Sequence, residues 1–137
     1  MIERIARRHR VLVVDDNAMN SKLVQFVLSA RGYDVRTASD ADEAVAAVTS
    51  FDPELILMDV QLPGIDGLEL TRRLKADPAT KGIVIVAATA YAMKGDEERV
   101  LAAGCDAYIS KPINTRTLPS QVFGLLSARH PPGDGVV

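Results

Sequence analysis

The sequence predicts one α/β domain in which helices cover both faces of a parallel sheet. Its 137 residues suit a single domain. Five short apolar runs alternate with stretches whose apolar residues recur at helical spacing. The first run, residues 11–14, is apolar at successive positions, as in a strand that is buried on both faces of a parallel sheet. The connections are short, which favours parallel pairing because each helix then crosses back over the sheet.

The first expected strand covers residues 11–14, which are all Val or Leu. Asn17 is suited to cap the helix that follows, and Gly32 is suited to end it. Residues 33–38 are predicted to form the second strand. The apolar side of the first helix is expected to carry Met19, Leu23, Phe26, Val27 and Ala30.

The second helix is expected to begin after Ser39 or Asp40, because either side chain can cap it. The third strand, residues 55–58, follows Pro53. The third helix is expected to begin near Asp66 and to end at residues 77–78, Asp-Pro. The apolar residues expected to pack from these two helices are Ala41, Ala44, Val45 and Val48, then Leu70 and Leu74.

The fourth strand is predicted over residues 83–86, which are β-branched throughout. A helix over residues 94–103 follows, and Gly104 closes it. A short strand over residues 107–109 precedes the last helix, which has the weakest local signal. Pro119 fits there only in the first turn, and Gly124 costs about 1 kcal/mol relative to Ala. The residues expected to pack from this helix are Leu118, Val122, Leu125 and Leu126.

Composition and charge bear on location and partners. The net charge of −2 gives no overall attraction to nucleic acid. No apolar run approaches the roughly 20 residues of a membrane span, and no signal peptide is apparent. The single cysteine, Cys105, excludes an intramolecular disulfide and fits a cytoplasmic location. We therefore expect a cytoplasmic protein that binds neither nucleic acid nor membrane.

Both ends of the chain differ from the expected domain at residues 10–128. Residues 129–137 are rich in Pro and Gly and are expected to form a disordered tail. Residues 1–9 are expected to form a leader. We interpret the local basic cluster as a solvated part of the chain; it contains Arg4, Arg7, Arg8, His9 and Arg10.

The exceptional polar residues fall where the expected strands end. Asp15 and Asp16 follow the first strand, Asp59 ends the third, and Thr89 and Lys111 follow the fourth and fifth. Each residue alone could be an ordinary cap or turn former. Together they mark one edge of the sheet, which is where open α/β sheets bind ligands.

These residue types suit phosphoryl chemistry. Three converging carboxylates repel one another, and a hydrated Mg²⁺ would relieve that repulsion. A lysine can pair with a phosphoryl oxygen, and a hydroxyl can donate a hydrogen bond to one. The chain has no Gly-rich P-loop, so a bound nucleotide is not expected. A carboxylate can itself accept the phosphoryl group as an acyl phosphate.

Four motifs, in this order, make the chain similar to a known family. It resembles the receiver domain of two-component response regulators over about residues 10–128. Residues 89–99 and 104–108 resemble in particular the single-domain members of that family. The motifs are Val13-Val14-Asp15-Asp16-Asn17, Leu57-Met58-Asp59-Val60-Gln61-Leu62-Pro63-Gly64, Ala88-Thr89-Ala90 and Tyr108-Ile109-Ser110-Lys111-Pro112.

The resemblance implies a flavodoxin-like receiver fold: a doubly wound five-stranded parallel sheet in the order 2-1-3-4-5 with five helices. It implies that Asp59 accepts the phosphoryl group and that the ammonium of Lys111 pairs with Asp59 and then with that group. It also implies that the peptide bond between Lys111 and the following proline is cis. It assigns the switch to Thr89 and Tyr108. The implied Mg²⁺ ligands are Asp16 directly, Asp15 mainly through water, Asp59, and the backbone carbonyl of Gln61.

The resemblance also implies a function. A histidine kinase or histidine phosphotransfer protein would donate to Asp59, and the output would be binding to a downstream protein target. Such a chain turns over no external substrate, so it is not an enzyme in that sense. We expect a stand-alone regulator that is a monomer or a weak dimer. A phosphorelay intermediate, or a receiver module of a hybrid histidine kinase, is the alternative.

Two functions from other classes fit the sequence less well. A flavodoxin-like cofactor binder needs a phosphate-cradling loop after the first strand, but that loop contains Asp15 and Asp16, which would repel a phosphate. An aspartate-dependent phosphatase needs a second aspartate two residues after its nucleophile, where this chain has Gln61.

Overall fold

A computed structural model describes residues 9–62, 64–90 and 94–129. Residues 1–8 of the expected leader and 130–137 of the expected tail lie outside the described residues, as do Pro63 and residues 91–93. Strands and helices alternate along the described chain. In chain order they are β1 (Arg10–Val14), α2 (Ala18–Ser29), β2 (Asp34–Ala38), α3 (Ala41–Phe51), β3 (Leu55–Asp59), α4 (Gly67–Ala76), β4 (Val84–Thr89), α5 (Lys94–Ala102), β5 (Ala107–Ser110) and α6 (Leu118–Arg129).

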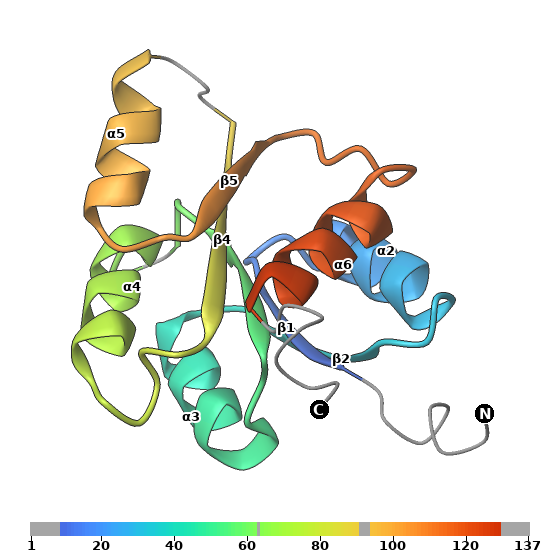
Figure 1. The fold of residues 1–137 in the computed structure, drawn as a ribbon, viewed down its shortest axis with the longest axis horizontal. Helices are drawn as coiled ribbons and strands as arrows, with labels where there is room; N and C mark the ends of the chain where they lie inside the picture. Colours follow the sequence, from blue (N-terminus) through green and yellow to red (C-terminus); the bar gives the residue numbers. More distant parts are fainter. Residues whose placement is uncertain (1–8, 63, 91–93, 130–137) are drawn as a thin grey trace.

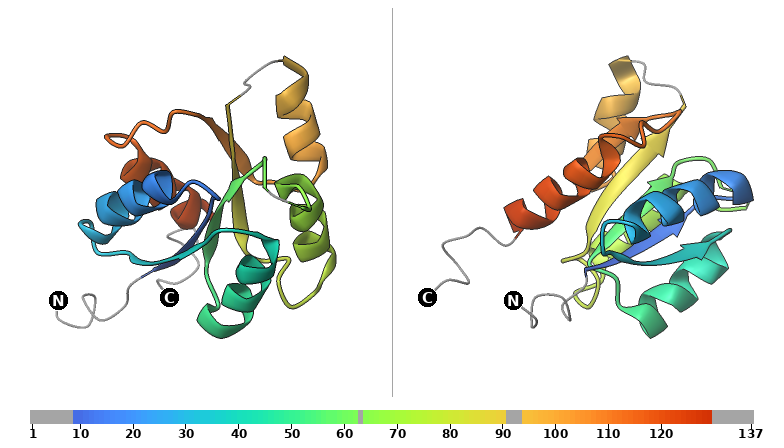
Figure 2. Two further views of the ribbon diagram at one scale, coloured as in Figure 1. Left: turned by 180° about the vertical axis from the view of Figure 1, so that it is seen from behind. Right: turned by 90° about the vertical axis from the view of Figure 1, so that its right-hand side faces the viewer.

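The strands form one parallel sheet in the order β2-β1-β3-β4-β5, as expected (Figure 1). In the register of the central pairs, Val14 lies opposite Met58, and Asp59 lies opposite Ala88. The helices lie in two layers, with α2 and α6 on one face and α3, α4 and α5 on the other (Figure 2). The predicted α/β fold class is therefore confirmed.

Each face of the sheet has its own apolar core. On the α2–α6 face, Val24 and Leu28 pack with Leu118 and Val122 over the sheet. On the other face, residues of α3, α4 and α5 pack around Ile56, Met58 and Ile85. β1 is buried from Val11 to Val14 and β3 along its whole length, because helices cover both sides. This burial explains why the strands are apolar at successive positions.

Side-chain caps fix the starts of three helices. The Asn17 side chain accepts from the N–H of Asn20 at the start of α2, and the Asp66 side chain accepts from the N–H of Glu69 at the start of α4. Asp40, rather than Ser39, caps α3. Gly32, at a φ of 95°, follows the last turn of α2. Such caps satisfy N–H groups that have no partner within the helix.

The prediction for the packing side of α2 was wrong. Met19, Leu23 and Phe26 are 82%, 51% and 74% exposed, whereas Val24 and Leu28 face the core. Lys22 is the one charged residue of this helix, so apolar residues occur on most of its circumference and periodicity could not identify the buried side. In α3, Val45 was also misplaced, being 50% exposed.

Differences in the other elements are small. β2 begins at Asp34, one residue later than expected, and β4 starts at Val84 but extends to Thr89. The last helix forms despite its weak signal, with Pro119 in the first turn, as the sequence required. Among the described helices, none is long and apolar enough to span a membrane.

Candidate functional site

The site lies at the carboxyl edge of the sheet. β1 leads through α2 to β2 on one side, and β2 leads through α3 to β3 on the other side of β1, so the strand order reverses between β1 and β3. Asp15 directly follows β1, and Asp59 is the last residue of β3. This edge, at the reversal of strand order, is where open α/β sheets bind ligands.

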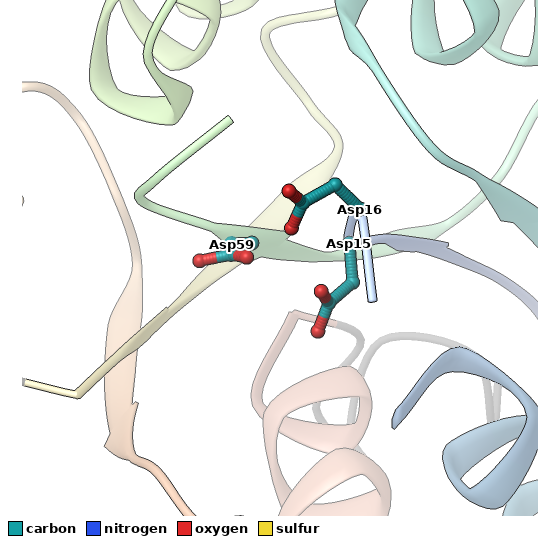
Figure 3. A group of neighbouring side chains, drawn as sticks. All are labelled: Asp15, Asp16 and Asp59. Carbon is teal, nitrogen blue, oxygen red and sulfur yellow. The ribbon is translucent and has the colours of Figure 1, made fainter. Parts of the chain in front are cut away.

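Three carboxylates converge there. Asp15, Asp16 and Asp59 each offer an oxygen, and these oxygens all lie within 4.8 Å of one another (Figure 3). Asp15 and Asp59 are buried, whereas Asp16 is exposed. Buried like charges at this separation repel one another, so the edge favours a cation.

Local turns hold one oxygen of each buried carboxylate. The N–H of Asn17 donates to Asp15 Oδ1 at 2.8 Å, and the N–H of Gln61 donates to Asp59 Oδ1 at 3.0 Å. In both cases the donor lies two residues after the aspartate, which is the geometry of an Asx turn. The orientation of each carboxylate is therefore fixed by its own loop.

Lys111 faces the other oxygens of the same carboxylates. Its Nζ lies 3.0 Å from Asp59 Oδ2 and 3.6 Å from Asp15 Oδ2. The N–H of Lys111 donates to the carbonyl of Thr89 at 2.8 Å, which fixes the chain after β5 against the end of β4. The peptide bond between Lys111 and Pro112 is cis, as the resemblance implied.

The environment of Asp59 makes its charge unfavourable. Burial raises the pKa of this carboxyl above its ordinary value, and the charge of Asp15 raises the pKa further. The hydrogen bonds from Lys111 and from the N–H of Gln61, together with the Lys111 charge, lower the pKa and offset part of that rise. The net direction is upward because desolvation disfavours the charged form. A cation at the site would favour the ionised carboxylate.

The donor set fits a hard divalent cation. The cluster consists of carboxylates, with none of the thiolate or imidazole ligands that a zinc site would use. One of its members, Asp16, is exposed, so the site is open to water. Mg²⁺ prefers oxygen ligands and usually keeps several waters. The fourth predicted ligand, Gln61, lies two residues after Asp59 with its N–H on the Asp59 side chain.

The two predicted switch residues lie on neighbouring strands. Thr89 is buried at the end of β4 and pairs with Ser110. Tyr108 lies on β5 opposite Ala87, half-buried against the core on the α3–α4–α5 face. Its hydroxyl lies 3.5 Å from a carboxylate oxygen of Glu97 on α5, at the outer limit of a hydrogen bond. Tyr108 thus connects β5 to α5.

Sequence reasoning missed two features of this region. A pocket of about 320 Å³ adjoins the Lys111 side chain, and its wall combines α2 with loops after β4 and β5. Gly67 packs directly against the backbone of Asp59. The sequence carries no signal for this contact, because it depends on how closely α4 approaches β3. The pocket is lined by Asn20, Leu23, Val24, Ala90, Lys111, Pro112, Ile113 and Thr115.

Comparison with known proteins agrees with this geometry. Residues 11–123 match the model of the response regulator receiver domain family. The polar-differentiation response regulator DivK of Brucella ovis is 47% identical over 104 residues, which is 76% of this chain and 85% of that protein.

Solved structures give the same result. The CheY-like response regulator receiver domain protein of Methanospirillum hungatei JF-1 is similar with a TM-score of 0.83 and 31% identity, covering 90% of this chain and 98% of that one. The chemotaxis response regulator CheY4 of Vibrio cholerae has a TM-score of 0.82 and 27% identity, covering 87% and 99%. The chain therefore belongs to the response regulator receiver domain family.

Proposed function

We propose that this chain is a stand-alone response regulator that accepts a phosphoryl group on Asp59 from a phosphohistidine donor, with Mg²⁺, and signals by binding another protein. One observation carries the proposal. Asp59 Oδ2 lies 3.0 Å from the ammonium of Lys111 and beside two further carboxylates, at the carboxyl edge of the sheet. Carboxylates with a nearby lysine are the groups that phosphoryl transfer to an aspartate needs.

In the proposed step an Asp59 oxygen attacks the phosphorus of the donor. A P–O bond forms, the P–N bond to the imidazole breaks, and the imidazole keeps the electron pair. Mg²⁺ held by Asp15, Asp16, Asp59 and the carbonyl of Gln61 would neutralise the carboxylates and the phosphoryl oxygens. Lys111 would move from its pair with Asp59 to a phosphoryl oxygen. The Asx turn at Gln61 keeps the nucleophile oriented.

The proposed donor docks on α2. Met19, Leu23 and Phe26 form an exposed apolar stripe along this helix, and Leu23 also lines the pocket beside Lys111. Interfaces are enriched in Met and aromatic side chains and depleted in charge. A helical phosphodonor with an apolar face could cover the stripe and bring its histidine to the carboxyl edge.

The proposed output begins at Thr89. Its hydroxyl would bond the phosphoryl group, and Tyr108 would move into the space released between β4 and β5. The contact from Tyr108 to Glu97 would change with it, which would alter the α5–β5–α6 surface. NMR with beryllofluoride tests this. Shifts from Thr89 through Tyr108 to residues 94–102 are expected, and shifts confined to the loops at Asp16, Asp59 and Lys111 would contradict it.

Phosphorylation is tested by mass. With a small-molecule phosphodonor and Mg²⁺ the protein should gain one phosphoryl group, and EDTA should abolish the gain. Asp59→Asn should gain none. Asp77→Asn is the matched control, because it makes the same change at the exposed C-cap of α4, at the other end of that helix, and should behave as wild type. A phosphorylated Asp59→Asn protein would refute the assignment.

Docking is tested by changing the donor. Phe26→Glu should slow transfer from a phosphohistidine protein by about tenfold or more, because it places a charge in the apolar contact. It should leave transfer from a small-molecule donor unchanged. Val45→Glu makes the same kind of change at an exposed apolar position of α3 and should affect neither. Equal slowing by both variants would exclude α2 as the docking helix.

A further inference from the structure

We propose that Gly67, the first residue of α4, is a positioning residue for Asp59. Its missing side chain lets the start of α4 rest directly against the backbone of the phosphoacceptor, and that contact sets where the Asp59 loop lies. The inference rests on the proposed function of Asp59, and it adds a residue that touches neither the metal nor the phosphoryl group.

The space at position 67 is already filled. A Cβ placed on Gly67 would collide with the carbonyl oxygen of Asp59, and it would lie 3.0 Å from the carbonyl carbon of Asp59 and 3.1 Å from Met58 Cγ. The obstacle is mainly backbone, which cannot move aside as a flexible side chain can. By contrast, a Cβ at Gly124 on α6 would meet nothing within 4 Å.

Backbone conformation is not the reason for this glycine. The described glycines with positive φ are Gly32, Gly64 and Gly104, and Gly67 is not among them. An alanine at position 67 could therefore adopt the same φ and ψ. What position 67 requires is the absence of a Cβ, because α4 and β3 approach so closely there.

Hydrogen bonds hold Gly67 in this contact from both sides. Its N–H donates to the carbonyl of Val60 at 2.9 Å, which closes the loop that follows Asp59. Its carbonyl accepts from Thr71 Oγ1 at 2.8 Å. Thr71 is completely buried, and Cys105 Sγ lies 3.9 Å from its hydroxyl. The first turn of α4 is thus fixed between the core and the Asp59 loop.

The same loop carries the reacting groups. The N–H of Gln61 orients the Asp59 carboxylate, and Gln61 lies one residue after Val60, which is bound to Gly67. Displacing the Asp59 carbonyl must therefore change both the direction of the carboxylate and the position of the Gln61 backbone. Errors of about 1 Å at a reacting group can lower a rate about 100-fold.

The first test compares two Gly→Ala variants. Gly67→Ala should lower the rate of phosphorylation by a small-molecule donor about 100-fold. It should also weaken Mg²⁺ binding about tenfold. Mg²⁺ binding is measured by titration without phosphodonor, with ¹⁵N chemical shifts as the signal. Gly124→Ala should match wild type in both. A folded Gly67→Ala protein within about twofold of wild type in both would refute the positioning role.

The second test remains informative if Gly67→Ala does not fold. Thr71→Val keeps the shape of the side chain and removes its hydrogen bond to Gly67, whereas Thr71→Ser keeps the hydroxyl and removes the methyl group. Positioning predicts that Mg²⁺ affinity falls about fivefold in Thr71→Val, the equivalent of one net hydrogen bond, and is retained in Thr71→Ser. The reverse order would mean that Thr71 only fills space, and it would refute the proposal.

Wild type separates this inference from the proposed function. If wild type neither binds Mg²⁺ nor gains a phosphoryl group, the proposed function fails and the positioning role fails with it. If wild type does both while Gly67→Ala and Thr71→Val are unimpaired, only the positioning role is refuted.

Discussion

The two ends of the sheet differ in the charges that they bring together: mainly like charges at the carboxyl end and opposite charges at the amino end. At the carboxyl end, three carboxylates converge around one lysine, and the pKa of Asp59 is raised by burial. At the amino end, Glu54 meets His9 and Arg10, which lie across from it at the start of β1. Both ends lie on the same central strands, so the contrast comes from the side chains rather than the fold.

Contacts at the amino end pair Glu54 with two neighbouring basic residues. His9 Nδ1 lies 3.1 Å from Glu54 Oε2, and the N–H of Arg10 donates to Glu54 Oε1 at 3.0 Å. Burial alone would raise the pKa of Glu54, but the hydrogen bonds from Arg10 and His9 and their charges outweigh it, so this pKa is lowered. The guanidinium of Arg10 also donates to the carbonyl of Asp52 at 2.7 Å.

The contrast separates a structural edge from a candidate binding edge. Opposite charges at the amino end stabilise the fold without a ligand. The carboxyl end keeps more negative charge than its lysine can neutralise, and a cation would have to neutralise that excess before an anionic phosphoryl group could approach. Sites of this kind cost stability in the unliganded protein. Three substitutions test the contrast through the free energy of unfolding.

The largest effect is expected for Lys111→Met. Lys111 is 20% exposed and pairs with the buried Asp59 and Asp15, so its removal leaves both carboxylates without that cation. The free energy of unfolding at pH 7 should fall by about 2 kcal/mol, which is less than the roughly 3–5 kcal/mol lost when a fully buried pair is broken, because solvent screens this pair. Urea denaturation with and without Mg²⁺ measures this, and Mg²⁺ should restore part of the loss.

Lys22→Met is the matched control for this variant. Lys22 is exposed on α2, away from the carboxylate cluster, and its replacement should change stability by less than about 0.5 kcal/mol. A Lys111→Met protein as stable as Lys22→Met would mean that the carboxyl end carries no excess of charge.

A smaller effect of the opposite sign is expected for Asp59→Asn. Because the folded pKa of Asp59 is raised, its contribution to stability is present below the unfolded pKa and is lost as the pH rises through the folded pKa. At pH 7 the ionised carboxylate is therefore unfavourable, and Asp59→Asn should be more stable by about 1 kcal/mol.

The pH profile checks the origin of that gain. The difference between Asp59→Asn and wild type should shrink below about pH 4, near the unfolded pKa of Asp, where Asp59 is protonated in both states. Mg²⁺ should also reduce it, because the cation stabilises wild type more than the variant. If Asp59→Asn were less stable than wild type at pH 7 without Mg²⁺, the ionised Asp59 carboxylate would not be unfavourable in the folded protein.

Much of this architecture could be predicted from the sequence. The runs at Val11 and Leu55 have no polar position, which indicates strands covered on both faces, and Asp59 and Lys111 lie directly at or after strand ends. Because parallel strands bring their carboxyl ends to one edge, the convergence of these polar residues followed from topology. The close pairing of Asp59 with Lys111 and with the acidic pair agrees with that expectation.

Other features depend on contacts that periodicity does not encode. The stripe at Met19 and Phe26 has helical spacing, yet it faces solvent because Val24 and Leu28 fill the core better. The role of Gly67 depends on the distance between α4 and β3, which a sequence does not give. The charge pattern of Glu54 was missed because its partners His9 and Arg10 are about 45 residues away and become neighbours only in the sheet.

The smallest effect is expected at the amino end, for Glu54→Gln. The substitution keeps an acceptor for the N–H of Arg10 and removes the charge that faces His9 and Arg10. Since the Glu54 side chain is 19% exposed and its pairs are partly screened, the free energy of unfolding at pH 7 should fall by about 0.5 kcal/mol.

The pH dependence of this loss is opposite to that at Asp59. The folded pKa of Glu54 is lowered, so its contribution to stability is present above the unfolded pKa, about 4.3, and is lost as the pH falls through the folded pKa. Glu54→Gln should therefore be less stable than wild type at pH 7 and equal to it near pH 3. Glu69→Gln on the exposed surface of α4 is the control and should differ little from wild type at either pH. If Glu54→Gln were instead more stable at pH 7, as we expect for Asp59→Asn, both ends of the sheet would carry unfavourable charge, and the distinction between a structural edge and a candidate binding edge would fail.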